Sequence, residues 1–181
     1  MEIQDVVSPM DMLWSARDAL IIPQVEDSVI ERVMYPEKVL RTYAVKVGEV
    51  SDFSQLKSVY GTLTGMSGAC YIGLENLDPQ KVTVPFPMEF QAPQSLYACF
   101  YTFGPELSLP RQHELNLFAR MDDGGLYQYS YDVTAQILSA EDPWNVLIQV
   151  DSLPLPQLVR DNGNFVFSIE DWLSKEVPVK L

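Results

Sequence analysis

The chain lacks most of the residues on which enzyme and metal-site chemistry depends. Its 181 residues include one histidine, His113, and two cysteines, Cys70 and Cys99. Two cysteines are too few for a disulfide scaffold and do not have the spacing of zinc ligands, so no metal or cofactor is expected. We expect both thiols to be free and buried, with a single bridge between them as the alternative.

Positive charge and long apolar runs are also scarce. Lys and Arg number 12 against 25 Asp and Glu, which gives a net charge of −13. A surface this acidic repels nucleic-acid phosphates and anionic lipid headgroups. No apolar run approaches the about 18 residues that a membrane span requires, and the candidate Ala19–Ile22 is stopped by Pro23. Acidic Glu2 and Asp5 stand where a signal peptide needs basic residues, so either the protein is cytosolic or its targeting segment lies outside this chain.

The chain is rich in apolar material for a core. Apolar residues make up 47% of it, with 8 Phe and 9 Tyr, so we expect one folded domain. The dominant period of apolar residues is two, which is typical of strands with one buried face. The predicted core residues are Val82, Val84, Phe86, Leu115, Leu117, Tyr129, Val146, Ile148 and Val150.

Turn signals separate these strands at regular intervals. Asp122-Asp123-Gly124-Gly125 lies between two alternating segments and predicts a hairpin. Ser95–Phe103 is apolar on both faces, which predicts a central strand covered on both sides. Weaker strands are predicted at Val29–Tyr35, Arg41–Val47 and Val59–Met66, and single helical turns at Asp52–Lys57, Thr134–Ala140 and Ser168–Trp172. The pattern predicts an all-β fold, a two-sheet antiparallel β-sandwich with one or two short helical turns.

Few patterns indicate catalysis. His113 begins a predicted strand, and its neighbour Glu114 projects to the opposite face, so the two cannot form a base and its orienting acid. We therefore expect His113 to face solvent. The segment Gly65-Met66-Ser67-Gly68-Ala69 departs from the G-x-S-x-G of a nucleophile elbow, because its second glycine comes one position early. Acidic clusters such as Asp161-Asn162-Gly163-Asn164 are explained by the preference of Asp, Asn and Gly for turns.

Two segments indicate sheet edges. Pro85 and Pro87 lie two residues apart within a good strand, so both missing backbone donors fall on the same side. We expect this strand, whose side chains Val82, Val84 and Phe86 share one face, to lie at the border of a sheet. The prolines at its outer edge either prevent aggregation or reserve that edge for a partner strand. Near the end of the chain, Val177, Val179 and Leu181 share one face of a possible terminal strand. That strand either completes its own sandwich or pairs with a neighbouring subunit.

Several short segments, in this order and spacing, resemble a known family. They are Pro9–Ser15, Leu63–Gly68, Val82–Phe86, Phe103-Gly104, His113–Leu115, Tyr129–Thr134, Val150–Pro156 and Phe167–Trp172. Together they resemble the C-terminal domain of a fimbrillin-associated lipoprotein family of Bacteroidetes.

The resemblance implies a non-catalytic surface or fimbrial protein with a transthyretin-like β-sandwich. It also implies a lipoprotein signal, a lipidated cysteine and a β-domain upstream of this chain. Residues 1–18 would then lead in from that region, and residues 19–181 would form a single β-sandwich domain. The implied location is the cell surface, in a fimbria or at the outer membrane, with membrane contact only through a lipid anchor outside this chain.

Three functions follow from these observations. The first is a structural or adhesion component of a fimbria-like assembly, whose partners are other fimbrial or surface subunits joined by strand pairing. The second is a carbohydrate-binding β-sandwich that contacts a glycan through exposed Trp14, Trp144 or Tyr127. The third, an enzyme, would need an apolar pocket with converging polar groups near His113.

Overall fold

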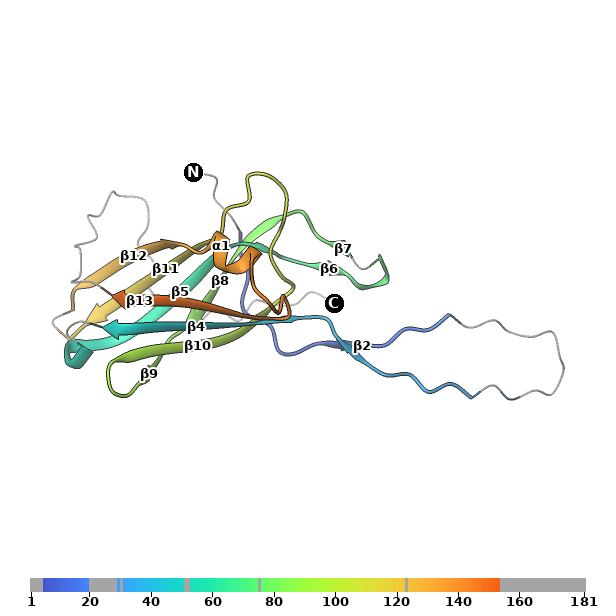
Figure 1. The fold of residues 1–181 in the computed structure, drawn as a ribbon, viewed down its shortest axis with the longest axis horizontal. Coiled ribbons are helices and arrows are strands. Elements are labelled where there is room, and N and C mark those ends of the chain that lie inside the picture. The colour runs from blue at the N-terminus through green and yellow to red at the C-terminus, as the bar shows by residue number, and fades with distance from the viewer. Residues whose placement is uncertain are drawn as a thin grey trace.

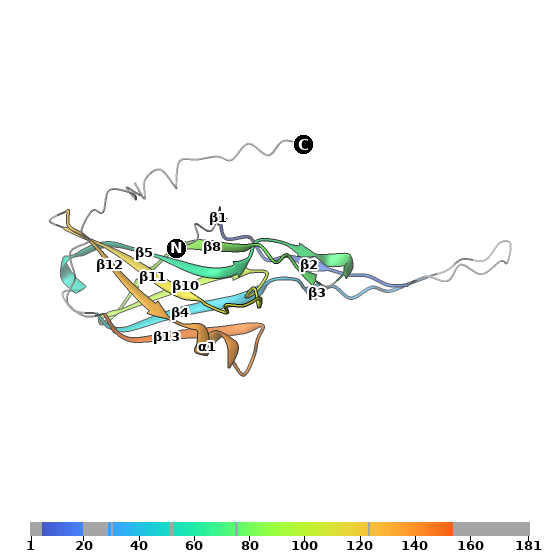
Figure 2. The same cartoon turned by 90° about the horizontal axis from the view of Figure 1, so that it is seen from above.

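The computed structural model describes residues 5–19, 29, 31–50, 53–74, 76–122 and 124–153. Two sheets lie face to face and enclose one core (Figure 1, Figure 2). The all-β sandwich predicted from the alternating apolar residues is therefore confirmed.

The larger sheet has five strands in the order β1-β8-β5-β11-β12. These strands are β1 (Asp5–Val6), β5 (Leu56–Ser67), β8 (Lys81–Pro87), β11 (Glu114–Met121) and β12 (Leu126–Asp132). Neighbouring strands are antiparallel, except that β1 runs parallel to β8. The β11–β12 hairpin confirms the prediction made from the two glycines between them.

The smaller sheet has four strands in the order β13-β4-β10-β9. These strands are β4 (Arg41–Val50), β9 (Glu89–Gln91), β10 (Ser95–Thr102) and β13 (Asn145–Leu153). β13 runs parallel to β4, and the other pairs are antiparallel. Only Met88 separates β8 from β9, so the chain passes from one sheet to the other at that residue.

Short elements surround the sandwich. β2 (Trp14–Ser15) pairs with β3 (Glu37–Lys38), and β6 (Cys70–Tyr71) pairs with β7 (Asn76–Leu77). The helical elements are η1 (Phe53–Gln55), η2 (Ile72–Leu74) and α1 (Thr134–Leu138). η1 and α1 confirm two of the predicted helical turns, and the third, Ser168–Trp172, lies outside the described residues.

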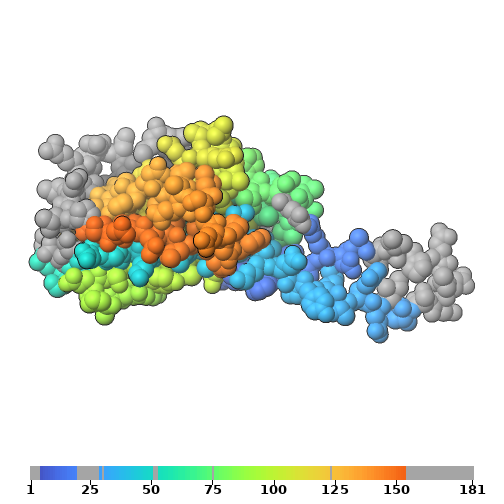
Figure 3. Space-filling model, in the orientation of Figure 1, coloured from blue at the N-terminus to red at the C-terminus, as the bar shows by residue number. Residues whose placement is uncertain are grey.

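The β2–β3 ribbon projects away from the sandwich as an arm (Figure 1, Figure 3). Residues 31–38 are exposed, including Val33 and Tyr35 at 75% and 81%. The prediction of a strand at Val29–Tyr35 is wrong for its described residues, because none of residues 29 and 31–35 lies in a strand and the pairing begins at Glu37.

The core contains all nine predicted residues, which confirms the predicted phase of the strands. Each is at most 8% exposed, and Leu115, Leu117 and Ile148 are completely buried. Residues at alternate positions of β4, β10 and β13 supply the opposite half of the core.

The outer face of β10 differs from its prediction. Ala98 and Phe100 are buried, whereas Tyr97 is half-buried and Cys99 is exposed. This strand is therefore covered on one face only, because the described residues place no second layer on the outside of the smaller sheet. Cys70 and Cys99 are free, but neither is buried, which corrects that expectation.

Candidate functional site

The outer edge of β8 is the first candidate interaction surface. Its even-numbered side chains, Val82, Val84 and Phe86, point into the core. The Met88 N–H donates to the Val59 carbonyl at 3.0 Å, and the Thr83 carbonyl accepts from the Val7 N–H at 3.0 Å. Backbone groups alternate sides along a strand, so the odd-numbered residues of β8 direct their backbone groups outward.

Pro85 and Pro87 are two of these odd-numbered residues, so their backbone groups point toward the outer edge of β8. They lie opposite Thr62 and Tyr60 of β5, so their missing N–H groups cost no hydrogen bond within the sheet. β1 lies outside β8 only at Val82 and Thr83. Among the described residues, β8 is thus an inner strand at that end and an edge strand over Pro85–Pro87, where the sequence predicted an edge along its whole length.

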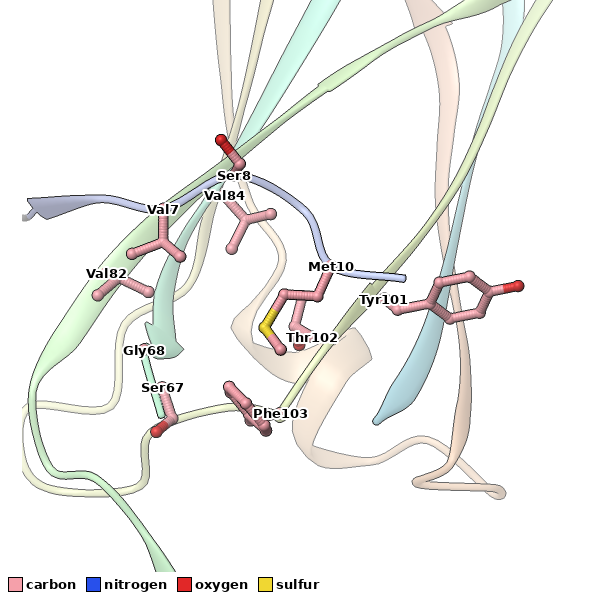
Figure 4. Close-up of a pocket in the computed structure, with 10 residues that line it drawn as sticks. All are labelled: Val7, Ser8, Met10, Ser67, Gly68, Val82, Val84, Tyr101, Thr102 and Phe103. Atoms are coloured by element: carbon pink, nitrogen blue, oxygen red, sulfur yellow. The ribbon is translucent and has the colours of Figure 1, made fainter. Parts of the chain in front are cut away.

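The segment after β1 lies between the two sheets at this edge. Val7 and Met10 face Val82 and Val84 of β8 on one side and Tyr101–Phe103 on the other (Figure 4). The crevice between them has a volume of about 10 Å³, which is room for about one water molecule. Binding sites for small molecules measure hundreds of Å³. This crevice is therefore too small for such a ligand and is a narrow gap between packed segments.

The outer edge of β13 is occupied by a side chain of α1. The carboxamide of Gln136 accepts a hydrogen bond from the Gln149 N–H at 2.8 Å and donates one to the Gln149 carbonyl at 3.0 Å. It therefore satisfies both backbone groups of Gln149, as a residue of a neighbouring strand would. Nothing in the sequence around Gln136 indicates this contact, because it depends on how α1 packs beside β13.

The other predicted edge strand, Val177, Val179 and Leu181, lies outside the described residues. Its role in assembly remains a proposal.

The three candidate aromatic contacts do not form one platform. Trp14 is 51% exposed on the arm, and Trp144 is 45% exposed immediately before β13. Lys38 lies over the ring of Trp14 at 5.9 Å from its centroid, and Arg41 lies over Trp144 at 5.6 Å. Tyr127 is half-buried beside Ala119, at the far end of the β11–β12 hairpin.

Trp14 and Trp144 lie at the same end of the sandwich. Asp142 accepts a hydrogen bond from the Trp144 N–H at 2.8 Å. Hydrogen bonds from Asn145 and from this N–H lower the pKa of Asp142, and the charge of Lys38 contributes. Lys38, which covers Trp14, is therefore also near the loop that carries Trp144.

His113 is buried, which contradicts its expected exposure. The segment between β10 and β11 folds back along β5, where the Ser67 N–H donates to the Gly104 carbonyl and the Glu106 N–H to the Gly65 carbonyl. His113 comes at the end of this segment, immediately before β11, and is only 1% exposed.

The ring of His113 has few polar contacts. Its Nδ1 lies 3.4 Å from the Thr64 carbonyl oxygen, and its Nε2 has no hydrogen-bond partner. Burial lowers the pKa of His113, partly opposed by the Thr64 carbonyl. A buried imidazole with so few polar contacts is typical of a structural residue, and His113 does not line the crevice beside β8, so the geometry does not favour the enzyme interpretation.

Among the described residues, no cluster of three or more His, Cys, Asp or Glu side chains is arranged to hold a metal ion. No helix in the same residues has the length and apolar character needed to cross a membrane.

Comparison with known proteins identifies relatives in sequence and fold. A family described as a domain of unknown function (DUF5119) matches residues 2–87. No curated protein matches the chain. A crystal structure of a candidate adhesin from Bacteroides ovatus is similar with a TM-score of 0.54 and 20% identity, over 83% of this chain and 62% of that one.

Two further structures are similar at lower scores. The fimbrial anchor protein Mfa2 from Porphyromonas gingivalis has a TM-score of 0.47 and 14% identity, over 81% of this chain and 55% of its own. A second candidate adhesin from Bacteroides ovatus has a TM-score of 0.44 and 10% identity, over 88% of this chain and 58% of that one. This chain spans less than two thirds of each of these proteins. In its fold this chain is similar to the first of these, the candidate adhesin from Bacteroides ovatus, which agrees with the resemblance seen in the sequence.

Proposed function

We propose that this chain is a non-catalytic structural or adhesion protein of the bacterial cell surface, an accessory component of a fimbria-like assembly. The observation that carries the proposal is the outer edge of β8, where a partner strand can pair beside core residues. The likeness in fold to a candidate adhesin supports the same role. Strand addition gains affinity from backbone hydrogen bonds and specificity from alternate side chains.

β1 covers this edge over a very short distance. Within the described part of the chain, which begins at Asp5, β1 pairs with β8 at Asp5 and Val6, and Val6 is 49% exposed. A two-residue parallel pairing contributes few hydrogen bonds, so an extended strand from a partner can compete with it. Pro85 and Pro87 would end such a pairing, because they offer no N–H to the incoming strand.

We propose that the terminal strand with Val177, Val179 and Leu181 on one face pairs with a neighbouring subunit. Deletion of Val177–Leu181 tests this in Bacteroidetes cells that produce the full-length protein. Immunogold labelling would count the protein in surface fibres, and the melting temperature of the purified chain would report folding. Lys180→Ser, on the other face of the segment, is the matched control.

We expect the truncated chain to melt like the intact one and to be missing from the fibres, with Lys180→Ser still incorporated. Unfolding of the truncated chain would assign the segment to its own sandwich. Normal incorporation of a folded truncated chain would also contradict the proposed role of the segment.

Anchoring belongs to the same proposal. We infer a cell-surface location with membrane contact only through a lipid anchor outside this chain, which is consistent with its net charge of −13. Metabolic labelling of the full-length precursor with a fatty-acid analogue would detect that anchor, and an unlabelled precursor would contradict it.

Carbohydrate binding is the second candidate. It is favoured by the half-exposed indole rings of Trp14 and Trp144, which lie at one end of the sandwich. A glycan array probed with the purified chain and with a Trp14→Ala/Trp144→Ala variant would test it. Binding that the double variant loses supports this function, and an array without binding contradicts it.

A further inference from the structure

The outer edge of β12 lacks the protection that the outer edges of β8 and β13 have. The Val133 N–H donates to the His113 carbonyl at 3.0 Å, so odd-numbered residues of this hairpin strand direct their backbone groups toward β11. Even-numbered residues, among them Gln128 and Ser130, therefore direct theirs outward. β12 is the last strand of its sheet in the part of the chain that the structure describes.

No protecting device closes this edge among the described residues. Natural sheets protect their edges with prolines, lysines, bulges or covering segments. β8 has two prolines and β1, and β13 has the carboxamide of Gln136. β12 reads Leu-Tyr-Gln-Tyr-Ser-Tyr-Asp and contains neither proline nor lysine.

The side chains of β12 leave its outer backbone accessible. Gln128 and Ser130 both donate hydrogen bonds to the Oδ1 of Asn116 on β11, away from the outer edge. Asp132, the single charged residue of the strand, accepts a hydrogen bond from the Thr134 N–H at 2.9 Å. These contacts direct the polar side chains toward this chain's own residues.

The sequence of β12 is complementary to itself in an antiparallel register centred on Tyr129. In that register Gln128 lies opposite Ser130 of the second copy, and their outward backbone groups can exchange hydrogen bonds. Tyr127 then lies opposite Tyr131 on the inner face, where both rings are half-buried in the single chain. Aromatic cross-strand pairs stabilise antiparallel sheets.

Charge favours this edge over other surfaces for contact between two copies. Each copy carries −13, so most approaches bring like charges together. β12 contributes only Asp132 to the contact, at the end of the strand and opposite Leu126 of the second copy. A twofold pairing through one shared strand also gives the closed symmetry that most soluble dimers have.

We propose that β12 pairs with β12 of a second copy of this chain, antiparallel and centred on Tyr129, so that two five-stranded sheets become continuous. The pairing requires no fimbrial partner, so it can fail or succeed independently of the proposed function. Since it joins two acidic proteins, the dimer should become tighter as salt screens their charges.

Sedimentation velocity over a range of protein concentrations tests the pairing with two substitutions at one position. Ser130→Pro removes the outward N–H, at a position where an edge strand tolerates proline. Ser130→Ala is the matched control, because it loses the same hydrogen bond to Asn116 but keeps the N–H. We expect the unmodified chain and Ser130→Ala to dimerise with the same affinity and Ser130→Pro to stay monomeric.

A second measurement covers the case in which Ser130→Pro does not fold. Hydrogen exchange of the unmodified chain should show the amides of Gln128 and Ser130 becoming protected as concentration rises, while the amide of Tyr129 stays protected throughout. An unmodified chain that is monomeric at all concentrations overturns the proposal. So does dimerisation of a folded Ser130→Pro chain, or concentration-independent exchange at Gln128 and Ser130.

Discussion

The rings of Phe86 in β8 and Phe100 in β10 stack across the core with their centroids 4.1 Å apart and their planes 14° from parallel. This contact joins the two sheets directly. It also explains a glycine in β5, because a Cβ on Gly61 would lie 2.3 Å from the Phe86 ring.

Gly61→Ala should therefore destabilise the fold. The added methyl group forces the Phe86 ring out of its stack, and overpacking of this kind costs about 1 to 3 kcal/mol. Urea unfolding would measure the loss. Gly73→Ala is the matched control, because nothing lies within 4 Å of a Cβ at that position; equal effects of the two substitutions would contradict the steric explanation.

Leu117→Ala should be among the most damaging single substitutions. Leu117 is completely buried, and truncating such a leucine costs about 2 to 5 kcal/mol. Leu147→Ala, at a leucine that is 50% exposed on β13, should cost much less. Comparing the two free energies of unfolding checks the assigned faces, and a loss below about half a kcal/mol at Leu117 would mean that its environment is wrong.

Gln136→Met should expose the edge of β13. It removes two hydrogen bonds to Gln149, each with a net contribution of about 0.5 to 1.5 kcal/mol, while keeping a residue that favours helices. Hydrogen exchange should become faster at the Gln149 amide. Ser139→Ala removes the hydrogen bond that Ser139, at the C-terminal end of α1, donates to the Ala135 carbonyl, and it serves as the control. Unchanged exchange at Gln149 in the Gln136 variant would show that the helix alone protects the edge.

Acid should weaken the fold through His113. Burial lowers the pKa of this residue below its ordinary 6.5, while the Thr64 carbonyl raises it, Lys81 lowers it, and Glu106 and Asp132 raise it. Between the lowered pKa and pH 6.5 the unfolded chain therefore binds a proton that the folded chain does not. The stabilisation is fully present above that pH and is lost as the pH falls toward the lowered pKa.

Chemical unfolding of the unmodified chain and of His113→Gln across this pH range isolates the contribution of the histidine. The difference in stability between the two should shrink on acidification, because glutamine does not titrate. A difference that stays constant with pH would show that His113 does not titrate differently in the folded and unfolded states.

The sequence was sufficient to predict the elements whose periodicity extends over a whole strand. Val82, Val84 and Phe86 alternate without interruption, and the paired glycines after Asp123 identify the hairpin. Its predictions failed where burial depends on distant segments. Nothing local reveals that His113 becomes buried against β5, or that Cys99 lies on a face that the described residues leave uncovered.

The candidate site was predictable in part for the same reason. Pro85 and Pro87 identify an edge because proline itself lacks the N–H that a neighbour would need. The Gln136 carboxamide and its contact with Gln149 arise from tertiary packing alone. The accessible edge of β12 also required the full order of strands, since the same sequence in an inner strand would present no edge.

The parallel pairing of β4 with β13 determines when the smaller sheet can be completed during synthesis. Thr42 pairs with Asn145 and Val50 with Leu153. β4 therefore cannot pair along this edge until β13, the last strand that the structure describes, has been synthesised. Contacts between residues so distant in the chain slow folding. Until β13 leaves the ribosome, one edge of β4 is unpaired and the core lacks Val146, Ile148 and Val150. Incomplete chains with unpaired strand edges and exposed apolar surface are prone to aggregation.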